Sequence, residues 1–264
     1  MKVAIGVTTY NRPKFLAKSL RALNDNLRGL EAPVWVCNDG SGPKYSAEYR
    51  RAYTRFPGAT IIECPENRGV AAAKNTLLRM MLDVTNADWF FLLEDDIEIT
   101  SSKAISAYVD AAEEFGTHHL SFAHHGPANA QGPTAIEGQI EFYPHSIGAW
   151  CLYSRHSLEE AGLFDENFHN AWEHVEHELR LIQQGLMPGA GPHRFPDVAG
   201  SAGWLRELPN SIEKSAIRPR SDWQASIAQG LAYWRQAKPS TFDAMFGAGT
   251  PLESYARGIL GDVD

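Results

Sequence analysis

The stretch WFFLLEDD, residues 89–96, joins five apolar residues to three consecutive carboxylates. The apolar part is short enough for a buried strand, and the carboxylates stand where such a strand would end. Adjacent carboxylates repel one another, and burying one costs several kcal/mol unless a cation pairs with it. Ligands of open α/β sheets bind at the carboxyl ends of the strands. The stretch therefore predicts a ligand site with a divalent cation, the alternative being a solvated turn.

The composition limits the classes of protein to which the chain can belong. Its 264 residues, 44% of them hydrophobic, can bury the core of one large domain or of a domain with a cap. No apolar run approaches the roughly 20 residues of a membrane span, and the N-terminus lacks the apolar core of a signal peptide. The three cysteines are widely spaced in apolar surroundings, which favours reduced thiols. We therefore expect a cytoplasmic protein without stable membrane insertion.

The net charge of −8 bears on the choice of partner. It argues against a broad surface for non-specific nucleic-acid binding, which would need a basic face. It does not exclude a local basic groove. An anionic substrate would need Arg, Lys or a metal ion to offset the acidic background.

The first half of the chain alternates strand-like apolar runs with helical patterns. This order is typical of a mostly parallel sheet covered by helices, and so of an α/β protein. Beyond residue 123 the chain becomes rich in Gly, Pro and His, which indicates a junction, and residues 188–203 have the composition of a mobile loop. The expected strands of the first half are 3–8, 34–37, 60–63, 89–93 and 120–123.

Six segments resemble, in the same order, the motifs of family 2 glycosyltransferases. Each is a weak signal alone, but they occur in register, and the resemblance spans about residues 3–203 of the chain. The last two resemble the family patterns Gly-Gly-Phe-Asp-Glu-x-Phe and Trp-Glu-Asp-x-Asp-Leu-x-Leu-Arg. The segments are TTYNRP (8–13), CNDGS (37–41), NRGVAAAKN (67–75), the acidic strand end (94–96), GLFDENF (162–168) and WEHVEHELRL (172–181).

The resemblance implies a GT-A (Rossmann-like) fold, with a mostly parallel central sheet flanked by helices, a smaller acceptor-side subdomain and C-terminal helices. Residues 1–123 would form the half of the domain that binds a nucleotide sugar. Residues 124–210 would form the acceptor and catalytic half of the same domain. Residues 211–264 would be a helical extension, whose apolar side chains pack on the body or on the second chain of a homodimer.

The resemblance also implies a nucleoside-diphosphate sugar donor, UDP- or GDP-linked, at the strand ends. The first motif could contact base and phosphate, although it also reads as an ordinary helix start. A carboxylate at position 39 can accept two hydrogen bonds from a base or ribose, and the family commonly has Arg where this chain has Lys74. The implied donor-binding residues are Thr8, Thr9, Tyr10, Arg12, Asn38, Asp39, Arg68, Lys74, Glu94 and Asp95, with Arg218 and Arg220 closing over the diphosphate or lying at the surface.

Asp95 and Asp96 resemble the metal-binding motif of the family, with Glu94 in place of its first Asp. A hard ion, Mn²⁺ or Mg²⁺, would bridge these carboxylates and the diphosphate and stabilise the charge of the leaving group. The resemblance favours Asp96 as the direct ligand. His177 and His193 could also bind metal, although a lone histidine is more often a hydrogen-bonded structural residue.

Glu173 and His174 occupy the place of the Glu-Asp pair whose acid acts as general base in the family. An imidazole titrates near neutral pH, so either residue could take the proton of the acceptor hydroxyl. Trp150 and Trp172 could stack on a sugar or another planar acceptor, although tryptophans more often pack in a core.

The sequence thus predicts an inverting, metal-dependent glycosyltransferase, a hexosyl- or pentosyltransferase. Its acceptor hydroxyl would belong to a glycan, a lipid-linked sugar or a modified nucleic-acid base. One alternative is an enzyme that acts specifically on a hydroxylated DNA base. Another, prompted by the histidine in the catalytic pair, is a catalytically silent nucleotide-sugar-binding protein. A nicotinamide enzyme is not expected, because no Gly-x-Gly-x-x-Gly follows the first strand.

Overall fold

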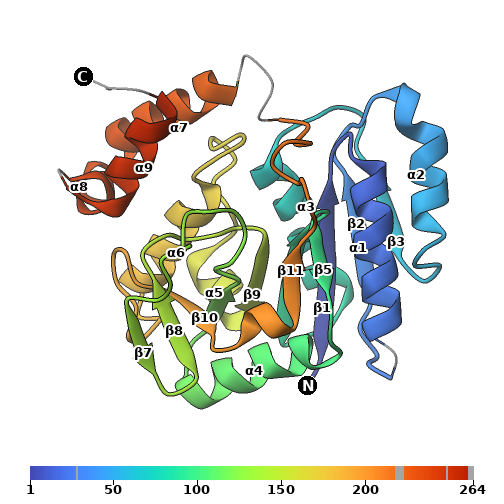
Figure 1. The fold of residues 1–264 in the computed structure, drawn as a ribbon, viewed down its shortest axis with the longest axis horizontal. Helices are drawn as coiled ribbons and strands as arrows, with labels where there is room; N and C mark the ends of the chain where they lie inside the picture. Colours follow the sequence, from blue (N-terminus) through green and yellow to red (C-terminus); the bar gives the residue numbers. More distant parts are fainter. Residues whose placement is uncertain (28, 218–222, 248, 261–264) are drawn as a thin grey trace.

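The computed structural model describes residues 1–27, 29–217, 223–247 and 249–260. A six-stranded sheet in the order β3-β2-β1-β4-β9-β6 forms its centre (Figure 1). The first four of these strands run parallel, and β9 runs antiparallel to both β4 and β6. The strands are β1 (Val3–Thr9), β2 (Val34–Asn38), β3 (Thr60–Glu63), β4 (Trp89–Glu94), β6 (His119–Ser121) and β9 (Trp150–Ser154).

The apolar stretch that ends in three acids is confirmed as the central strand β4. Its first five residues are buried, and it lies between β1 and β9. Thr8 pairs with Glu94, and Thr9 pairs with Asn38. Because parallel strands end at the same edge, this register brings the polar ends of β1, β2 and β4 together.

Helices cover both faces of the sheet. Side chains alternate across a strand, so Val3, Ile5 and Val7 of β1 pack in a core with α1, α2 and α4, whereas Ala4 packs in a second core with α3, α5 and α6. α3 approaches closely, since a side chain at Gly6 would meet Leu77 at 3.1 Å. The helices are α1 (Pro13–Asn26), α2 (Ser46–Tyr53), α3 (Val70–Val84), α4 (Lys103–Phe115), α5 (Arg155–Ala161) and α6 (Glu173–Gln183).

The region beyond residue 123 adds a small antiparallel sheet in the order β10-β8-β7. Asp197 of β10 is buried and accepts hydrogen bonds from Tyr108 of α4, the Ala123 amide and Ser201, which ties this sheet to the main body. Part of the stretch expected to be a mobile loop is thus a buried strand and a short helix. The elements are β5 (Ile97–Ile99), β7 (Ala135–Glu137), β8 (Ile140–Tyr143), β10 (Phe195–Val198), η2 (Ser201–Gly203) and β11 (Leu205–Glu207), which pairs with β5.

Three C-terminal helices pack against α6. Trp234 and Met245 are fully buried there with Phe168, Trp172 and Val175. In the part of the chain that the structure describes, no helix combines the length and the apolar character that a membrane crossing requires. The helices are α7 (Trp223–Ala237), α8 (Pro239–Phe246) and α9 (Pro251–Leu260) (Figure 1).

Candidate active site

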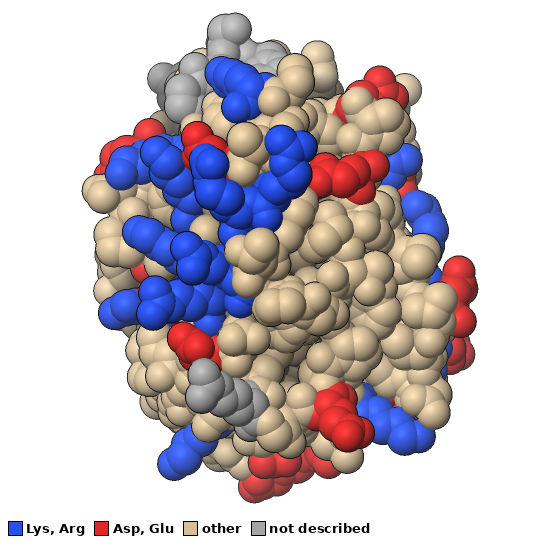
Figure 2. Space-filling model, turned by 90° about the vertical axis from the view of Figure 1, so that its right-hand side faces the viewer, with Lys and Arg blue, Asp and Glu red and all other residues tan. Residues whose placement is uncertain are grey.

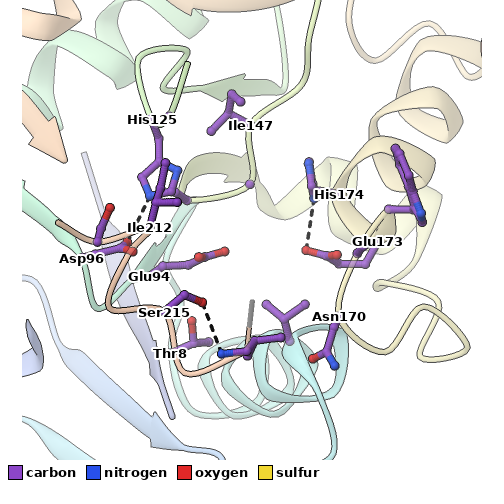
Figure 3. A pocket seen from close by; sticks show the side chains of 18 of the residues that line it. Thr8, Glu94, Asp96, His125, Ile147, Asn170, Glu173, His174, Ile212 and Ser215 are labelled. Carbon is purple, nitrogen blue, oxygen red and sulfur yellow. Dashed lines mark hydrogen bonds and ion pairs between the residues drawn. The ribbon is translucent and has the colours of Figure 1, made fainter. Parts of the chain in front are cut away.

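A cavity of about 400 Å³ lies at the carboxyl ends of β1, β2 and β4, a size typical of small-molecule sites. One end is polar and is built by the strand ends together with His125. The other end is more apolar and is built by residues 145–149, the start of α6 and the C-terminal segment. Figure 3 shows Glu94 and Asp96 across the cavity from Glu173 and His174. The apolar end includes Ile147, Trp172, Val175, Trp223, Ile227, Leu252 and Tyr255, whereas Ile212 lies beside His125 at the polar end (Figure 3).

Asp39 lies at the polar end, held by the turn that precedes α3. Its carboxylate accepts hydrogen bonds from the Asn67 side chain (2.7 Å) and from the amides of Arg68 (3.1 Å) and Gly69 (2.9 Å). Burial raises its pKa, and the amide hydrogen bonds act against that rise. The turn fits only because Gly40 has no side chain, which would meet the Glu66 backbone at 2.1 Å. The motifs CNDGS (37–41) and NRGVAAAKN (67–75) thus form one unit that orients Asp39 at the cavity.

Arg12 neutralises the acidic end of β4. Its Nη2 donates to Asp96 Oδ2 (2.7 Å), its Nε donates to Asp95 Oδ1 (2.9 Å), and its Nη1 reaches the Ser211 carbonyl (3.3 Å). The planar guanidinium suits such bidentate pairing. Thr9 Oγ1 also donates to Asp95, at 2.6 Å. The repulsion for which the sequence predicted a neutralising divalent cation is therefore largely relieved by an arginine of the chain itself.

The pKa values of the two aspartates are shifted in opposite directions. Burial and the charge of Asp96 raise the pKa of Asp95 to about 6, although Arg12 opposes this rise. Burial also disfavours ionised Asp96, but His125 and Arg12 together hold the pKa of Asp96 below its usual range. Asp96 is thus the more permanent anion of the pair.

His125 is the residue of this site that the sequence analysis missed. Its Nε2 lies 3.4 Å from Asp96 Oδ1 and 3.5 Å from Glu207. Burial lowers the pKa of His125, but Asp96 raises it further, so the net shift is upward. Within the described residues, neither Asp96 Oδ1 nor His125 Nε2 makes a hydrogen bond. The only signal in the sequence was the His-His-Gly turn at 124–126, which we interpreted as a junction.

Lys74 lies between the two ends of the cavity rather than in it. Its Nζ is 3.0 Å from Glu173 Oε1, 3.0 Å from the Gly148 carbonyl and 3.4 Å from Glu94 Oε1, and the side chain is 1% exposed. Burial lowers its pKa, but Glu173 and Glu94 raise it above the usual value. Lys74 therefore remains charged and links the acids of β4 and α6. The resemblance instead implied that it contacts the donor.

Glu173 and His174 form a hydrogen-bonded pair at the start of α6 (Figure 3). Glu173 Oε1 is 3.2 Å from His174 Nδ1 and also pairs with Lys74. Burial opposes ionisation of Glu173, but Lys74 and His174 hold its pKa well below its usual range. Burial lowers the pKa of His174, but Glu173 raises it to a net upward shift. A side chain at Gly148 would meet the His174 ring at 2.9 Å, so this glycine makes room for the imidazole.

This pair can act as an oriented base. An ionised carboxylate only accepts hydrogen bonds, so His174 Nδ1–H is the donor to Glu173. The lone pair of His174 then lies on Nε2, where a proton can be taken up. The His174 side chain is 20% exposed and lines the cavity, whereas that of Glu173 is 3% exposed.

Several residues predicted for the site lie elsewhere, because their side chains satisfy contacts inside the fold. Asn38 turns toward β3 and donates to Glu63 (2.6 Å). Arg68 runs along α3 to Thr76. Trp150 is fully buried between Phe91 and Tyr108 and does not line the cavity, in contrast to its predicted place beside an acceptor.

The two histidines considered as metal ligands are also remote from the acids of β4. His177 is fully buried, its Nε2 donates to the Gly162 carbonyl (2.8 Å), and burial lowers its pKa to about 3. His193 contacts the backbone of Pro144 and Ala244. Arg218 and Arg220 lie outside the described residues. Of the residues that the sequence predicted for the site, those that line the cavity are Thr8, Thr9, Tyr10, Arg12, Asp39, Glu94, Asp95, Asp96, Trp172, Glu173 and His174.

Trp172 contributes to the cavity wall mainly through packing. It is 4% exposed, adopts φ +74° as the residue before α6, and donates from Nε1 to the Ile227 carbonyl of α7. Because the left-handed conformation is unfavourable for a bulky residue, this packing must hold it. Trp172 thus joins the apolar end of the cavity to the C-terminal helices.

Sequence comparison matches residues 4–159 to the family described as Glycosyl transferase family 2. This chain belongs to that family. The match contains the strand ends of β1, β2 and β4, and stops before the α6 segment. No curated protein sequence matches this family 2 chain significantly.

Solved structures extend the likeness to almost the whole chain and show that it has the GT-A fold. The mannosyltransferase PcManGT of Pyrobaculum calidifontis, in complex with GDP-Man and Mn²⁺, has a TM-score of 0.58 at 16% identity, with 97% of this chain and 69% of that chain covered. S. aureus TarS 1–349 in complex with UDP-GlcNAc has a TM-score of 0.59 at 14% identity, with 98% and 74% covered. The family identifies this protein as a glycosyltransferase enzyme, and the solved structures share its fold.

Proposed function

We propose that this protein is an inverting glycosyltransferase that moves a sugar from a UDP- or GDP-linked donor to an acceptor hydroxyl. The observation that carries the proposal is the placement of the Glu173–His174 pair and the Glu94–Asp96 strand end on opposite sides of one cavity (Figure 3). A donor at the strand ends leaves its anomeric carbon facing α6. The structural neighbours, crystallised with GDP-Man and with UDP-GlcNAc, support a donor of this class.

In the proposed mechanism His174 is the general base. Its Nε2 takes the proton of the acceptor hydroxyl while that oxygen attacks the anomeric carbon from the face opposite the diphosphate. Glu173 holds the imidazole in the required tautomer and stabilises the imidazolium that forms, and Lys74 keeps Glu173 ionised. A base that titrates near neutral pH is well matched to this task. Asp39 would accept hydrogen bonds from the ribose or base of the donor.

The donor set of the polar end fits a divalent cation that arrives with the nucleotide. Asp96 Oδ1 and His125 Nε2 lack hydrogen bonds within the described residues and form an ion pair at 3.4 Å, so the cation would take the place of the proton on His125 Nε2. The described residues hold no cluster of three or more metal-ligating side chains, so diphosphate oxygens and water would complete the shell, as is usual for Mg²⁺. When bound, Mn²⁺ or Mg²⁺ would stabilise the charge of the departing diphosphate.

The proposal also includes a location in the cytoplasm and the chemistry of the acceptor. The three cysteines are free, which fits the reducing cytoplasm. The acceptor must carry a hydroxyl and must suit the apolar end of the cavity, where Ile147, Trp223 and Tyr255 lie.

A transfer assay with a panel of labelled UDP- and GDP-sugars, in Mn²⁺, Mg²⁺ or chelator, tests the proposal. We expect metal-dependent transfer or hydrolysis of one donor, and NMR of the product should show an inverted anomeric configuration. His174→Gln should retain nucleotide binding in calorimetry but lose turnover. Nucleotide binding by the wild type without turnover of any donor, and activity gained by His174→Asp, would instead identify a catalytically silent binding protein.

A further inference from the structure

The face of the molecule formed by α1 and α2 is strongly basic. Figure 2 shows Lys and Arg gathered over one half of this side. In this half, the exposed cations come from α1, from the short helix η1 (Pro43–Tyr45), from α2 and from the turn after it. The basic face, as we define it, consists of Lys14, Lys18, Arg21, Lys44, Arg50, Arg51 and Arg55.

This face stands out against the acidic character of the chain. Residues 11–55 hold nine of the 24 Lys and Arg residues but only four of the 32 Asp and Glu residues. Of these four acids, Asp39 is buried at the cavity, Glu48 is partly buried, Asp25 lies 3.8 Å from Arg21, and Glu31 is exposed. The positive charge of the face is therefore largely uncompensated, in a chain whose net charge is −8.

The basic face is joined directly to the donor end of the cavity. α1 begins immediately after Arg12, and α2 packs on α1. The Tyr49 hydroxyl of α2 lies 3.0 Å from Thr9 Oγ1 and accepts from the Arg12 amide at 3.1 Å. A polyanion bound on this face would consequently lie next to the cavity.

The chemistry of the face favours nucleic acid over a membrane. Lys14, Lys18 and Arg21 follow one another at i, i+4 and i+7, which forms a stripe about 10 Å long on one side of α1. A duplex offers one negative charge for about every 1.7 Å of its axis. Membrane-surface helices instead combine basic residues with apolar ones that enter the lipid. The large apolar side chains that are exposed in the described structure, Met1, Met80, Val84, Ile136 and Tyr255, all lie outside α1, η1 and α2.

The apolar end of the cavity is a second, independent observation. Enzymes that modify a base of a nucleic acid place it in a pocket with aromatic or apolar walls. Trp223, Tyr255 and Ile147 line such a wall across from the donor end, and Tyr255 also contacts the His145 ring at 5.8 Å between centroids.

We propose that the basic face binds the phosphate backbone of duplex DNA, and that the acceptor hydroxyl is carried by a base of this DNA. The first part depends only on the surface. The second part rests on the function proposed above, since it identifies the acceptor class of the same cavity.

Binding is tested by fluorescence anisotropy with a labelled DNA duplex over a range of salt concentrations. The double variant Lys18→Glu/Arg51→Glu should weaken binding at least tenfold. The slope of the logarithm of the binding constant against the logarithm of salt concentration should become shallower by about one for each lost phosphate contact. The matched control Lys2→Glu/Lys103→Glu changes two exposed lysines outside the face by the same charge. It should bind within twofold of the wild type.

Three results would overturn the surface proposal. The wild type could fail to bind the duplex at low salt, or the control variant could lose as much affinity as the double variant, which would show an effect of net charge alone. In the third case, vesicles of phosphatidylserine and phosphatidylcholine would bind through the same residues while DNA would not.

The acceptor is tested separately, by transfer of a labelled sugar to duplex DNA that contains hydroxymethylated pyrimidines. We expect transfer to this duplex and none to the unmodified one, with at least a tenfold rise in KM for DNA in the double variant and an unchanged affinity for the nucleotide. Transfer to an oligosaccharide but not to DNA would refute the acceptor assignment and keep the glycosyltransferase function. DNA binding without binding of any nucleotide sugar would refute the proposed function and leave the basic face in place.

Discussion

Two cations, the partly buried Arg12 and the buried Lys74, neutralise the acids of the cavity in different ways. Arg12 pairs with Asp95 and Asp96, two neighbours at the end of one strand, through several atoms of a planar group. Lys74 joins Glu94 and Glu173, which come from elements 79 residues apart in the chain, through a single ammonium group. Arg12 therefore shapes a local anion-rich edge for the donor, whereas Lys74 fixes the distance between the donor end and the catalytic end.

The contrast also shows how each site retains a reactive atom. At the Arg12 site, Asp96 Oδ1 is left without a hydrogen bond beside His125, among the described residues. At the Lys74 site, Glu173 uses one oxygen for both Lys74 and His174, so that the imidazole is oriented toward the cavity. In both cases a buried charge is neutralised without being closed off from a ligand.

The sharpest test of the comparison is Lys74→Met. It leaves Glu173 buried without its cation, so we expect a loss of about 3–5 kcal/mol in the free energy of unfolding, measured by urea denaturation, and little activity. The double variant Lys74→Met/Glu173→Gln removes the stranded charge as well and should recover most of the stability but not the activity. Equal instability of the single and double variants would contradict the ion-pair explanation.

His174→Gln should have the next largest effect. Removing a general base typically lowers turnover by about 10²–10⁴-fold, and since His174 lies away from the strand ends, KM for the donor should change little. Steady-state kinetics at saturating acceptor measures this split. A variant with unchanged kcat would exclude His174 as the base and return the role to Glu173.

Asp96→Asn should weaken metal binding without disturbing the fold. The amide keeps a hydrogen-bond acceptor for Arg12 but removes the anion. We therefore expect the factor by which Mn²⁺ raises nucleotide affinity to be about 10–100 times smaller than in the wild type. Calorimetry with and without the metal measures this factor. Asp95→Asn is the matched control, because Asp95 is enclosed by Arg12 and Thr9 and should contribute less to metal binding. Identical results for the two variants would remove the distinction that we draw between them.

The pH dependence of activity reports on His174. Burial lowers its pKa, but Glu173 raises it above 6.5, and only the neutral imidazole can accept a proton. kcat/KM should therefore fall up to tenfold for each pH unit below this raised pKa. Stability should change in the opposite sense: the imidazolium–Glu173 pair contributes stability below pH 6.5, and this contribution is lost as the pH rises through the raised pKa. Urea denaturation of wild type and His174→Gln against pH should differ in this window, and parallel curves would contradict the pairing.

Trp150→Phe should have the smallest effect. Trp150 is buried beside Phe91 and Tyr108, and its Nε1 makes no hydrogen bond among the described residues. Loss of packing and relief of the unpaired N–H act in opposite directions, so we expect a destabilisation of only about 1 kcal/mol, with KM for the acceptor unchanged. A large rise in that KM would show that Trp150 contacts the acceptor after all.

Much of the polar end of the cavity could be predicted from the sequence, because the signals there are local. An apolar run followed by acids fixes both the strand β4 and the position of its carboxylates, and parallel pairing then aligns Thr8 with Glu94 without further information. Asp39 and the Asn67–Gly69 turn were separate motifs in the sequence, and only the fold showed that the turn holds the carboxylate.

The catalytic end was less predictable. The sequence located Glu173 and His174 by resemblance, but it could not rank them, since their roles depend on which of them is exposed and on what pairs with the other. Residue type alone also suggested Trp150 and His177 as ligand-binding residues, and burial removed both from the cavity.

What this sequence determined by itself is the order of the elements, the family, and the edge of the sheet at which the acids stand, because periodicity and turn chemistry act over a few residues. Which charges meet was decided by tertiary structure alone. The contacts of Lys74 with Glu173, of Arg12 with Asp95, and of His125 with Asp96 join segments that are 99, 83 and 29 residues apart. Such contacts depend on the folded path of the chain, which no local pattern encodes.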